Sequence, residues 1–270
     1  MTHFRTAMLH RRLSVLLLSL FFALAGPTSA SAQSVASIVD QMQARYEDQL
    51  ETVDTYIVET NLYTSYNQKV MQDGRPTYKT QTRMTGEGSM AFAGSSTPSS
   101  AYGMRFDRLK QHATLAGTES IDGMRCYVLQ VDDPSKVDPD MGEDTGSMTY
   151  YVDANEYLAR RMVMQNKPSK KQGPQASSVT INLKNYTTTD GLTLPHRMEI
   201  QVAANMSKQQ RKKMETVMEQ MENMPEQQRK MMERTMGDQL EMMKQMLSGE
   251  PVVVEVQRVK VNTPIPSNIF

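Results

Sequence analysis

Short segments in which apolar and polar residues alternate recur along most of this chain, and they limit its fold more than any other feature. A period of two is the pattern of a β-strand with one apolar face. Asp122-Gly123 and Asp190-Gly191 separate neighbouring segments, and Asp-Gly favours tight hairpins because glycine tolerates a positive φ. Consecutive hairpins predict an antiparallel meander rather than βαβ units. About eleven strands are expected, at 54–66, 77–84, 88–93, 103–108, 112–118, 125–131, 147–152, 157–164, 178–187, 192–202 and 252–262.

Two regions have helical spacing instead. Over 34–50, apolar residues recur every three or four positions and predict an N-terminal helix with one apolar face. Residues 206–247 contain eleven of the chain's 24 methionines. Their spacing predicts two amphipathic helices that are joined or kinked near Met224-Pro225, because proline suits the first turn of a helix. Glu226 and Lys230 are expected to pair on the solvated side. The fold class is therefore α+β, mainly antiparallel β.

The first 32 residues have the features of a secretory signal peptide. Three arginines precede an apolar run over 13–25, which is short for a membrane span, and Ala30-Ser31-Ala32 fits a cleavage site. We expect residues 1–32 to be removed and residues 33–270 to form a single periplasmic domain. Because no cysteine stands at the cleavage point, we expect a soluble product rather than an acyl-anchored one. An uncleaved N-terminal anchor is the alternative.

Charge and residue types exclude several classes of protein. The chain has 30 basic and 30 acidic residues, so it lacks the basic excess that a dedicated nucleic-acid binder needs. Its one cysteine, Cys126, excludes a disulfide framework and a multi-cysteine zinc site, and its alternating segment predicts a buried thiol. After residue 32 the only histidines are His112 and His196, and neither lies in a catalytic motif. The acidic loop over 132–144 lacks EF-hand spacing and is expected to be solvated. We therefore expect no enzymatic activity, resident cofactor or metal site.

The methionines of 206–247 have three interpretations. They can form the helix face that packs on the sheet. They can provide a soft surface for lipids, since unbranched thioether side chains adapt to irregular apolar ligands. They can also bind Cu(I), because Met218-x-x-Met221-x-x-Met224 and Met243-x-x-Met246 place soft sulfur atoms on one face. The first two interpretations are compatible with one lid.

The whole pattern resembles the periplasmic outer-membrane lipoprotein-sorting and carrier superfamily, the LolA/LolB-like proteins. The resemblance is carried by Leu115–Val131, Tyr150–Met164, Ile181–Ile200 with its D-G-L-T-L-P hairpin, and the closing Val259–Phe270. It implies a curved antiparallel half-barrel that helices close on the concave side, around a cavity for acyl chains. The absence of tryptophan and the methionine-rich insertion depart from a typical carrier of this family.

Strand parity and helical spacing select candidate residues for such a cavity and its lid. A shift of one residue would reverse any choice of face in a strand. The residues expected to line the concave face and bind lipid are Tyr56, Val58, Leu62, Tyr66, Val179, Ile181, Leu183, Leu194, Met198 and Ile200. The residues expected to form the lid are Met214, Val217, Met218, Met221, Met232, Met236, Leu240, Met243 and Leu247.

The leading hypothesis for function is a periplasmic carrier that binds the acyl chains of lipoproteins or lipids for transfer toward the outer membrane. A transient membrane-associated protein partner fits this role. One alternative, which the resemblance also implies, is an envelope-stress sensor of the same fold that binds a protein partner. Another is a methionine-rich periplasmic protein that binds Cu(I).

Overall fold

The computed structural model describes residues 33–72, 75–84, 105–139, 141, 145–167, 175–205, 208–231, 244 and 247–270. Residues Val35–Phe270 form one compact unit. The helices are α2 (Val35–Thr52), α3 (Phe106–His112), α4 (Lys208–Glu222) and the 3-10 helix η3 (Pro134–Lys136). The first strands are β1 (Thr55–Thr60), β2 (Tyr63–Gln72), β3 (Arg75–Met84), β4 (Ala113–Ile121) and β5 (Met124–Val131). The others are β6 (Thr145–Asp153), β7 (Ala159–Asn166), β8 (Gln175–Thr189), β9 (Leu192–Asn205) and β10 (Val252–Val261).

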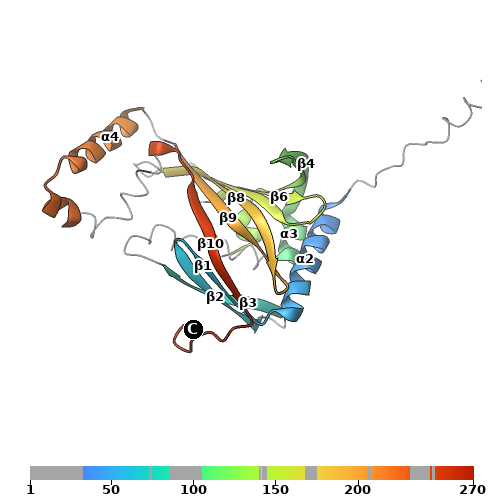
Figure 1. Ribbon diagram of the computed structural model, residues 1–270. Coiled ribbons are helices and arrows are strands. Elements are labelled where there is room, and N and C mark those ends of the chain that lie inside the picture. Colours follow the sequence, from blue (N-terminus) through green and yellow to red (C-terminus); the bar gives the residue numbers. More distant parts are fainter. Residues whose placement is uncertain are drawn as a thin grey trace, which may run out of the picture. The chain divides into compact units, whose positions relative to one another are not determined.

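The described strands form one 10-stranded sheet in the order β3-β2-β1-β10-β9-β8-β7-β6-β5-β4. Every neighbouring pair is antiparallel. Figure 1 shows the sheet as a curved layer in which β10 lies between β1 and β9, although β1 and β10 are far apart in the sequence. The expected α+β fold, an open curved antiparallel sheet with an N-terminal helix, is confirmed.

Both Asp-Gly hairpins form where the sequence predicts them. Asp122 and Gly123 have φ values of 50° and 81°, and Asp190 and Gly191 have values of 46° and 85°. Two successive positive φ angles match the twist of antiparallel strands, which explains why the chain uses glycine here.

Gly191 also lies close to the end of α2, and this contact leads to a prediction. A Cβ atom at position 191 would stand 2.9 Å from Thr52 Oγ1, whereas a Cβ at Gly123 would have no atom within 4 Å. We expect Gly191→Ala to lower the free energy of unfolding by about 2 kcal/mol, and Gly123→Ala by about 1 kcal/mol from backbone strain alone. Urea denaturation of both variants measures the difference. Equal losses would show that the contact with Thr52 costs nothing.

Two expected strands differ from the structure. The segment 54–66 is a hairpin of β1 and β2, because the Thr60 hydroxyl accepts the backbone N–H groups of Leu62 and Tyr63 and turns the chain. The segment 103–108 does not form a strand in its described part, since Phe106 begins helix α3, which buries Leu109 on one face. The expected strand at 88–93 lies outside the described residues.

Helix α2 has the apolar face that its spacing predicts. Its buried residues are Ile38, Val39, Met42, Tyr46, Gln49 and Leu50. The first three share a hydrophobic cluster with Leu109 of α3 and with side chains of β5–β10. Near its C-terminal end, the Tyr46 ring packs edge-on against Tyr78 of β3, at 6.4 Å between centroids. The helix therefore contacts both ends of the strand order on one side of the sheet.

Candidate functional site

One side of the sheet is apolar across most of its strands, and the register identifies its residues. Directly opposed residues of neighbouring strands share a face. Ile181 of β8 lies opposite Ile200 of β9 and Met162 of β7, and Met162 lies opposite Tyr150 of β6. We call this side the inner face, because α2 packs against it. The buried residues of its larger hydrophobic cluster on β5–β10 are Leu129, Val131, Met148, Tyr150, Val152, Ala159, Met162, Ile181, Leu183, Met198, Ile200 and Val254.

The inner face continues onto β1. Val58 lies opposite Val259, and Tyr56 lies opposite Val261 of β10. A second hydrophobic cluster forms there from Val53, Tyr56, Val58, Leu192 and Leu194. Eight of the ten predicted lipid-binding residues thus share one face of the sheet: Tyr56, Val58, Val179, Ile181, Leu183, Leu194, Met198 and Ile200.

Tyr66 does not lie with them. It is opposite Ile57, one residue out of phase with Tyr56 and Val58, so its ring is on the other face of the sheet. The expectation that Tyr66 shares their face is wrong, because the turn after Thr60 restarts the alternation in β2. Leu62 lies in that turn, is half-buried, and packs at the margin of the larger cluster.

Most of the inner face is filled by the protein's own side chains. Seven of the eight shared-face residues are at most 8% exposed, among them Leu183 at 3% and Met198 at 5%. The side chains of α2 and α3 supply much of this cover, since they belong to the same cluster. At the hairpin end, Gln49 Oε1 of α2 accepts the backbone N–H of Thr193 at 2.7 Å. A ligand can reach this part of the face only if these helices move.

The opposite end of the same strands is less covered. Val179 lies opposite Met164 and Val202, and Val252 lies opposite Ile200, which is two residues from Val202. All of them except Ile200 are half-buried. We call this region the insertion end, because β9 ends and β10 begins there, on either side of the methionine-rich insertion. Its residues are Leu62, Tyr63, Met164, Val179, Val202 and Val252.

The environment of the insertion end is apolar. Its one titratable side chain is the phenol of Tyr63, and burial raises the pKa of Tyr63 to about 12. A raised phenol pKa indicates that the charged form loses solvation there. The end therefore offers a half-covered apolar surface with no ionised group among its six residues at neutral pH.

The outer face of the sheet is charged. Arg197 of β9 donates to Glu255 of β10 at 2.6 Å and to Glu199 at 2.9 Å. Lys184 of β8 also pairs with Glu199 at 2.9 Å, and Lys260 pairs with Glu59 at 2.5 Å. Hydrogen bonds from Lys184 and Arg197 lower the pKa of Glu199. The sheet is thus amphipathic, with its charges on the side opposite the apolar surface.

The methionine-rich insertion begins with helix α4, which carries Met214, Met218 and Met221. Helix α4 ends at Glu222. Residues 223–225 are not helical, and a second helical stretch follows over 226–231. Lys230 and Glu226 form the expected pair at 2.8 Å. Met214 and Met221 are buried, Met218 is half-buried, and Val217 is 43% exposed, so Val217 lies at the margin of the apolar stripe.

The rest of the predicted lid is less completely described. Met232, Met236, Leu240 and Met243 lie outside the described residues. Leu247 is half-buried, and its carbonyl accepts a hydrogen bond from Arg211 Nη1 of α4 at 3.2 Å. Gln201 Nε2 of β9 donates to the carbonyl of Gly249 at 3.2 Å. These two contacts hold the C-terminal part of the insertion near the start of α4 and near β9.

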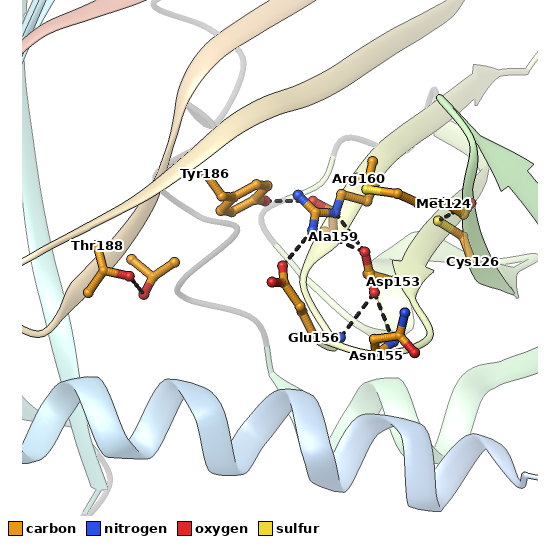
Figure 2. A network of polar contacts seen from close by, with 10 residues as sticks. Met124, Cys126, Asp153, Asn155, Glu156, Ala159, Arg160, Tyr186 and Thr188 are labelled. Atoms are coloured by element: carbon orange, nitrogen blue, oxygen red, sulfur yellow. Dashed lines mark hydrogen bonds and ion pairs between the residues drawn. The ribbon is translucent and has the colours of Figure 1, made fainter.

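Figure 2 shows a buried polar network at the bend between β6 and β7. Arg160 donates to Asp153 at 3.0 Å and to Glu156 at 2.5 Å, and its guanidinium lies 4.9 Å from the Tyr186 ring centre. The nearby Cys126 is free and fully buried, as its segment predicts. Burial raises the pKa of the Cys126 thiol, and the Asp153 carboxylate raises it further.

Arg160 pairs with both Asp153 and Glu156, so these groups can hold the bend between β6 and β7. His112 is exposed at the end of α3, and the buried Nε2 of His196 has no hydrogen-bond partner in the described part of the chain.

Within the described residues, no helix is long and apolar enough to cross a membrane.

No protein-family model and no curated protein matches the sequence. Among solved structures, a DUF1329 family protein from Desulfovibrio piger is 11% identical, with 87% of this chain and 96% of that chain covered and a TM-score of 0.43. A putative outer membrane lipoprotein-sorting protein domain from Vibrio parahaemolyticus is 10% identical, with coverage of 86% and 94% and a TM-score of 0.46. A LolA superfamily protein from Nitrosomonas europaea is 13% identical, with coverage of 88% and 98% and a TM-score of 0.38.

Proposed function

We propose that this protein is a carrier that binds the acyl chains of lipoproteins or lipids on its inner face, without breaking a bond. The observation that carries the proposal is the insertion end, where the apolar face continues beyond the part that α2 and α3 fill. The proposed location is the periplasm, after removal of residues 1–32, and the proposed direction of transfer is toward the outer membrane.

The physical need for such a carrier is large. Exposing an acyl chain of about 15 methylenes to water costs on the order of 12 kcal/mol. A protein can transfer the chain through water only if it covers most of that area. Six half-buried apolar residues offer a starting surface, and the buried rows behind them, such as Ile181 and Ile200, continue it. Entry at the insertion end followed by displacement of α2 or α3 would extend the contact along the strands.

The methionine-rich insertion is the proposed lid. Its two ends are joined to β9 and β10 at the insertion end, so a motion of the insertion would cover or uncover the apolar surface there. The flexible thioether side chains of Met214 and Met221 can pack in more than one arrangement, which suits a segment that covers an empty site and a filled one. A membrane-associated partner that engages the lid would couple opening to the membrane surface.

Native mass spectrometry of the protein purified from the cell envelope tests the proposal. We expect a bound lipid mass that is lost on denaturing extraction and is regained when the refolded protein is mixed with phospholipid or a triacylated lipopeptide. Rebinding should raise the unfolding midpoint, because the ligand binds the folded state alone. A preparation with no lipid mass and an unchanged midpoint in the presence of either probe would contradict carriage.

A further inference from the structure

The first half of helix α4 carries a group of cations that the carrier proposal does not use. We call it the basic cluster, and its members are Lys208, Arg211, Lys212 and Lys213. All four are exposed, and the first turn of α4 contains no acidic residue. Within the described residues none of them forms an ion pair, whereas Lys184 and Lys260 on the outer face of the sheet both do. The charge of the basic cluster is therefore available to a partner.

The stability of the helix does not account for this arrangement. The N-terminal end of a helix has a partial positive charge, so cations in the first turn lower its stability and anions raise it. In α4 the order is reversed, because the cations come first and the exposed Glu215 and Glu219 follow. Contact between the cations and an anionic partner would offset this loss of stability.

Two hydrogen bonds place the basic cluster next to the insertion end. Arg211 Nη1 donates to the carbonyl of Leu247, and Gln201 Nε2 of β9 donates to the carbonyl of Gly249. Strand β10 begins at Val252, three residues after Gly249. A partner that binds the basic cluster would therefore lie beside the half-covered apolar surface of the insertion end.

We propose that the basic cluster docks the protein on a lipid bilayer that contains anionic headgroups. Together with its methionines, the cluster makes the first half of α4 a basic amphipathic helix, which is typical of segments that lie at a membrane surface. Val217, which is 43% exposed, lies one helical turn from Lys213 and adds an apolar contact.

The distribution of the cations favours a bilayer over an acidic protein. With 3.6 residues per turn, the positions from Arg211 to Lys213 by way of Lys208 span about 200° of the helix circumference. A groove in a protein contacts one face of a helix, so it would leave part of this charge unmatched. A fluid layer of headgroups can meet long, flexible lysine side chains from several sides.

The second half of α4 sets the orientation of docking. Glu215 and Glu219 are exposed, and an anionic surface repels them. We therefore expect the first half of the helix to contact the bilayer and the second half to tilt away from it. Because the first half lies next to the insertion end, docking would bring the apolar surface of the sheet close to the bilayer.

Flotation of the protein, purified from the cell envelope, with lipid vesicles tests the docking. One set of vesicles contains phosphatidylglycerol and phosphatidylcholine in a ratio of about 1:3, and the other contains phosphatidylcholine alone. We expect binding to the anionic vesicles only. The affinity should fall at least about tenfold when the salt concentration rises from about 50 to about 500 mM, because salt screens the exposed charges.

A pair of variants with equal net charge tests the location. The double variant Lys208→Gln with Lys212→Gln should bind anionic vesicles about 25-fold more weakly, since each cation near such a surface contributes about fivefold. Glutamine is a good helix former, so α4 should persist. Arg125→Glu removes the same two units of charge at an exposed position of β5, and should change the affinity less than about twofold. Circular dichroism should show both variants folded.

Three results would overturn the proposal: no binding to the anionic vesicles, equal binding to vesicles of phosphatidylcholine alone, or equal losses in the double variant and in Arg125→Glu. The docking does not rest on carriage of acyl chains. A protein that binds anionic vesicles but carries no lipid mass would support docking and contradict the carrier proposal. A bound lipid mass without vesicle binding would do the reverse.

Discussion

Replacing Asp153 with alanine is expected to lower the free energy of unfolding by about 3 kcal/mol, because it leaves a buried guanidinium without its main partner. The Asp153 side chain is 4% exposed and that of Arg160 is 10% exposed. Arg160 Nε donates to Asp153 Oδ2 at 3.1 Å. The other carboxylate oxygen accepts the backbone N–H groups of Asn155 and Glu156 at 2.8 and 3.0 Å. One carboxylate therefore holds both the turn after β6 and the ion pair (Figure 2).

Two further variants separate these roles. Asp153→Asn keeps an oxygen that can accept the turn N–H groups, so we expect an intermediate loss. Glu156→Ala removes a partner of Arg160 that is 51% exposed, and should cost less than about 1 kcal/mol. Urea denaturation at neutral pH measures the free energy of unfolding of the three variants and ranks their losses. If Asp153→Ala and Glu156→Ala cost the same, the buried carboxylate does not have the role we assign to it.

The network also has a pH dependence. Burial by itself raises the pKa of Asp153, but the N–H groups of Glu156 and Asn155 and the Arg160 guanidinium together hold it below the ordinary value of 3.8. A depressed carboxyl pKa contributes stability that is present above the unfolded value and is lost as the pH falls through the folded value. The wild-type protein should therefore lose more stability than Asp153→Ala as the pH falls below about 4.

Local signals in the sequence predicted the fold where the chain uses residues with a strong conformational preference. Asp190-Gly191 adopts the two positive φ angles that such a pair favours, and the apolar spacing of α2 matches its buried face. The turn after Thr60 contains neither glycine nor proline. The Thr60 hydroxyl holds this turn by accepting backbone hydrogen bonds, and the sequence gives no local signal for that. The alternation therefore predicts one continuous strand over 54–66, and this error places Tyr66 on the wrong face of the sheet.

The candidate site was less accessible to sequence reasoning, for a physical reason. Alternation identifies the face of a strand, and it grouped Val179 with Ile181, Leu183, Met198 and Ile200 correctly. It does not show which part of that face another element covers. Val179 and Ile181 are both aliphatic residues on the inner face of β8, and both lie opposite apolar residues of the neighbouring strands. Only Ile181 belongs to the buried core beneath α2. The distinction depends on where a helix crosses the sheet, which is a tertiary property.

Val179→Lys is expected to remove most of the lipid binding while leaving the fold intact. Val179 is half-buried between Met164 and Val202 at the insertion end, so a lysine there can extend its ammonium group to water in the empty protein. An acyl chain laid over the same surface would have to desolvate that charge. We expect a loss of about 2 kcal/mol, roughly thirtyfold in affinity, for an environment-sensitive fluorescent fatty acid.

Thr180→Lys is the matched control, because it introduces the same charge one residue further along β8, on the outer face. Thr180 lies opposite Gln201 and Val163 and is also half-buried. Circular dichroism and urea denaturation should show both variants folded, with fatty-acid affinity changed in Val179→Lys alone. If the two lysines weaken fatty-acid binding equally, the loss of affinity comes from the added net charge and not from the position of the lysine on the inner face. If neither does, the acyl chain lies elsewhere than at the insertion end.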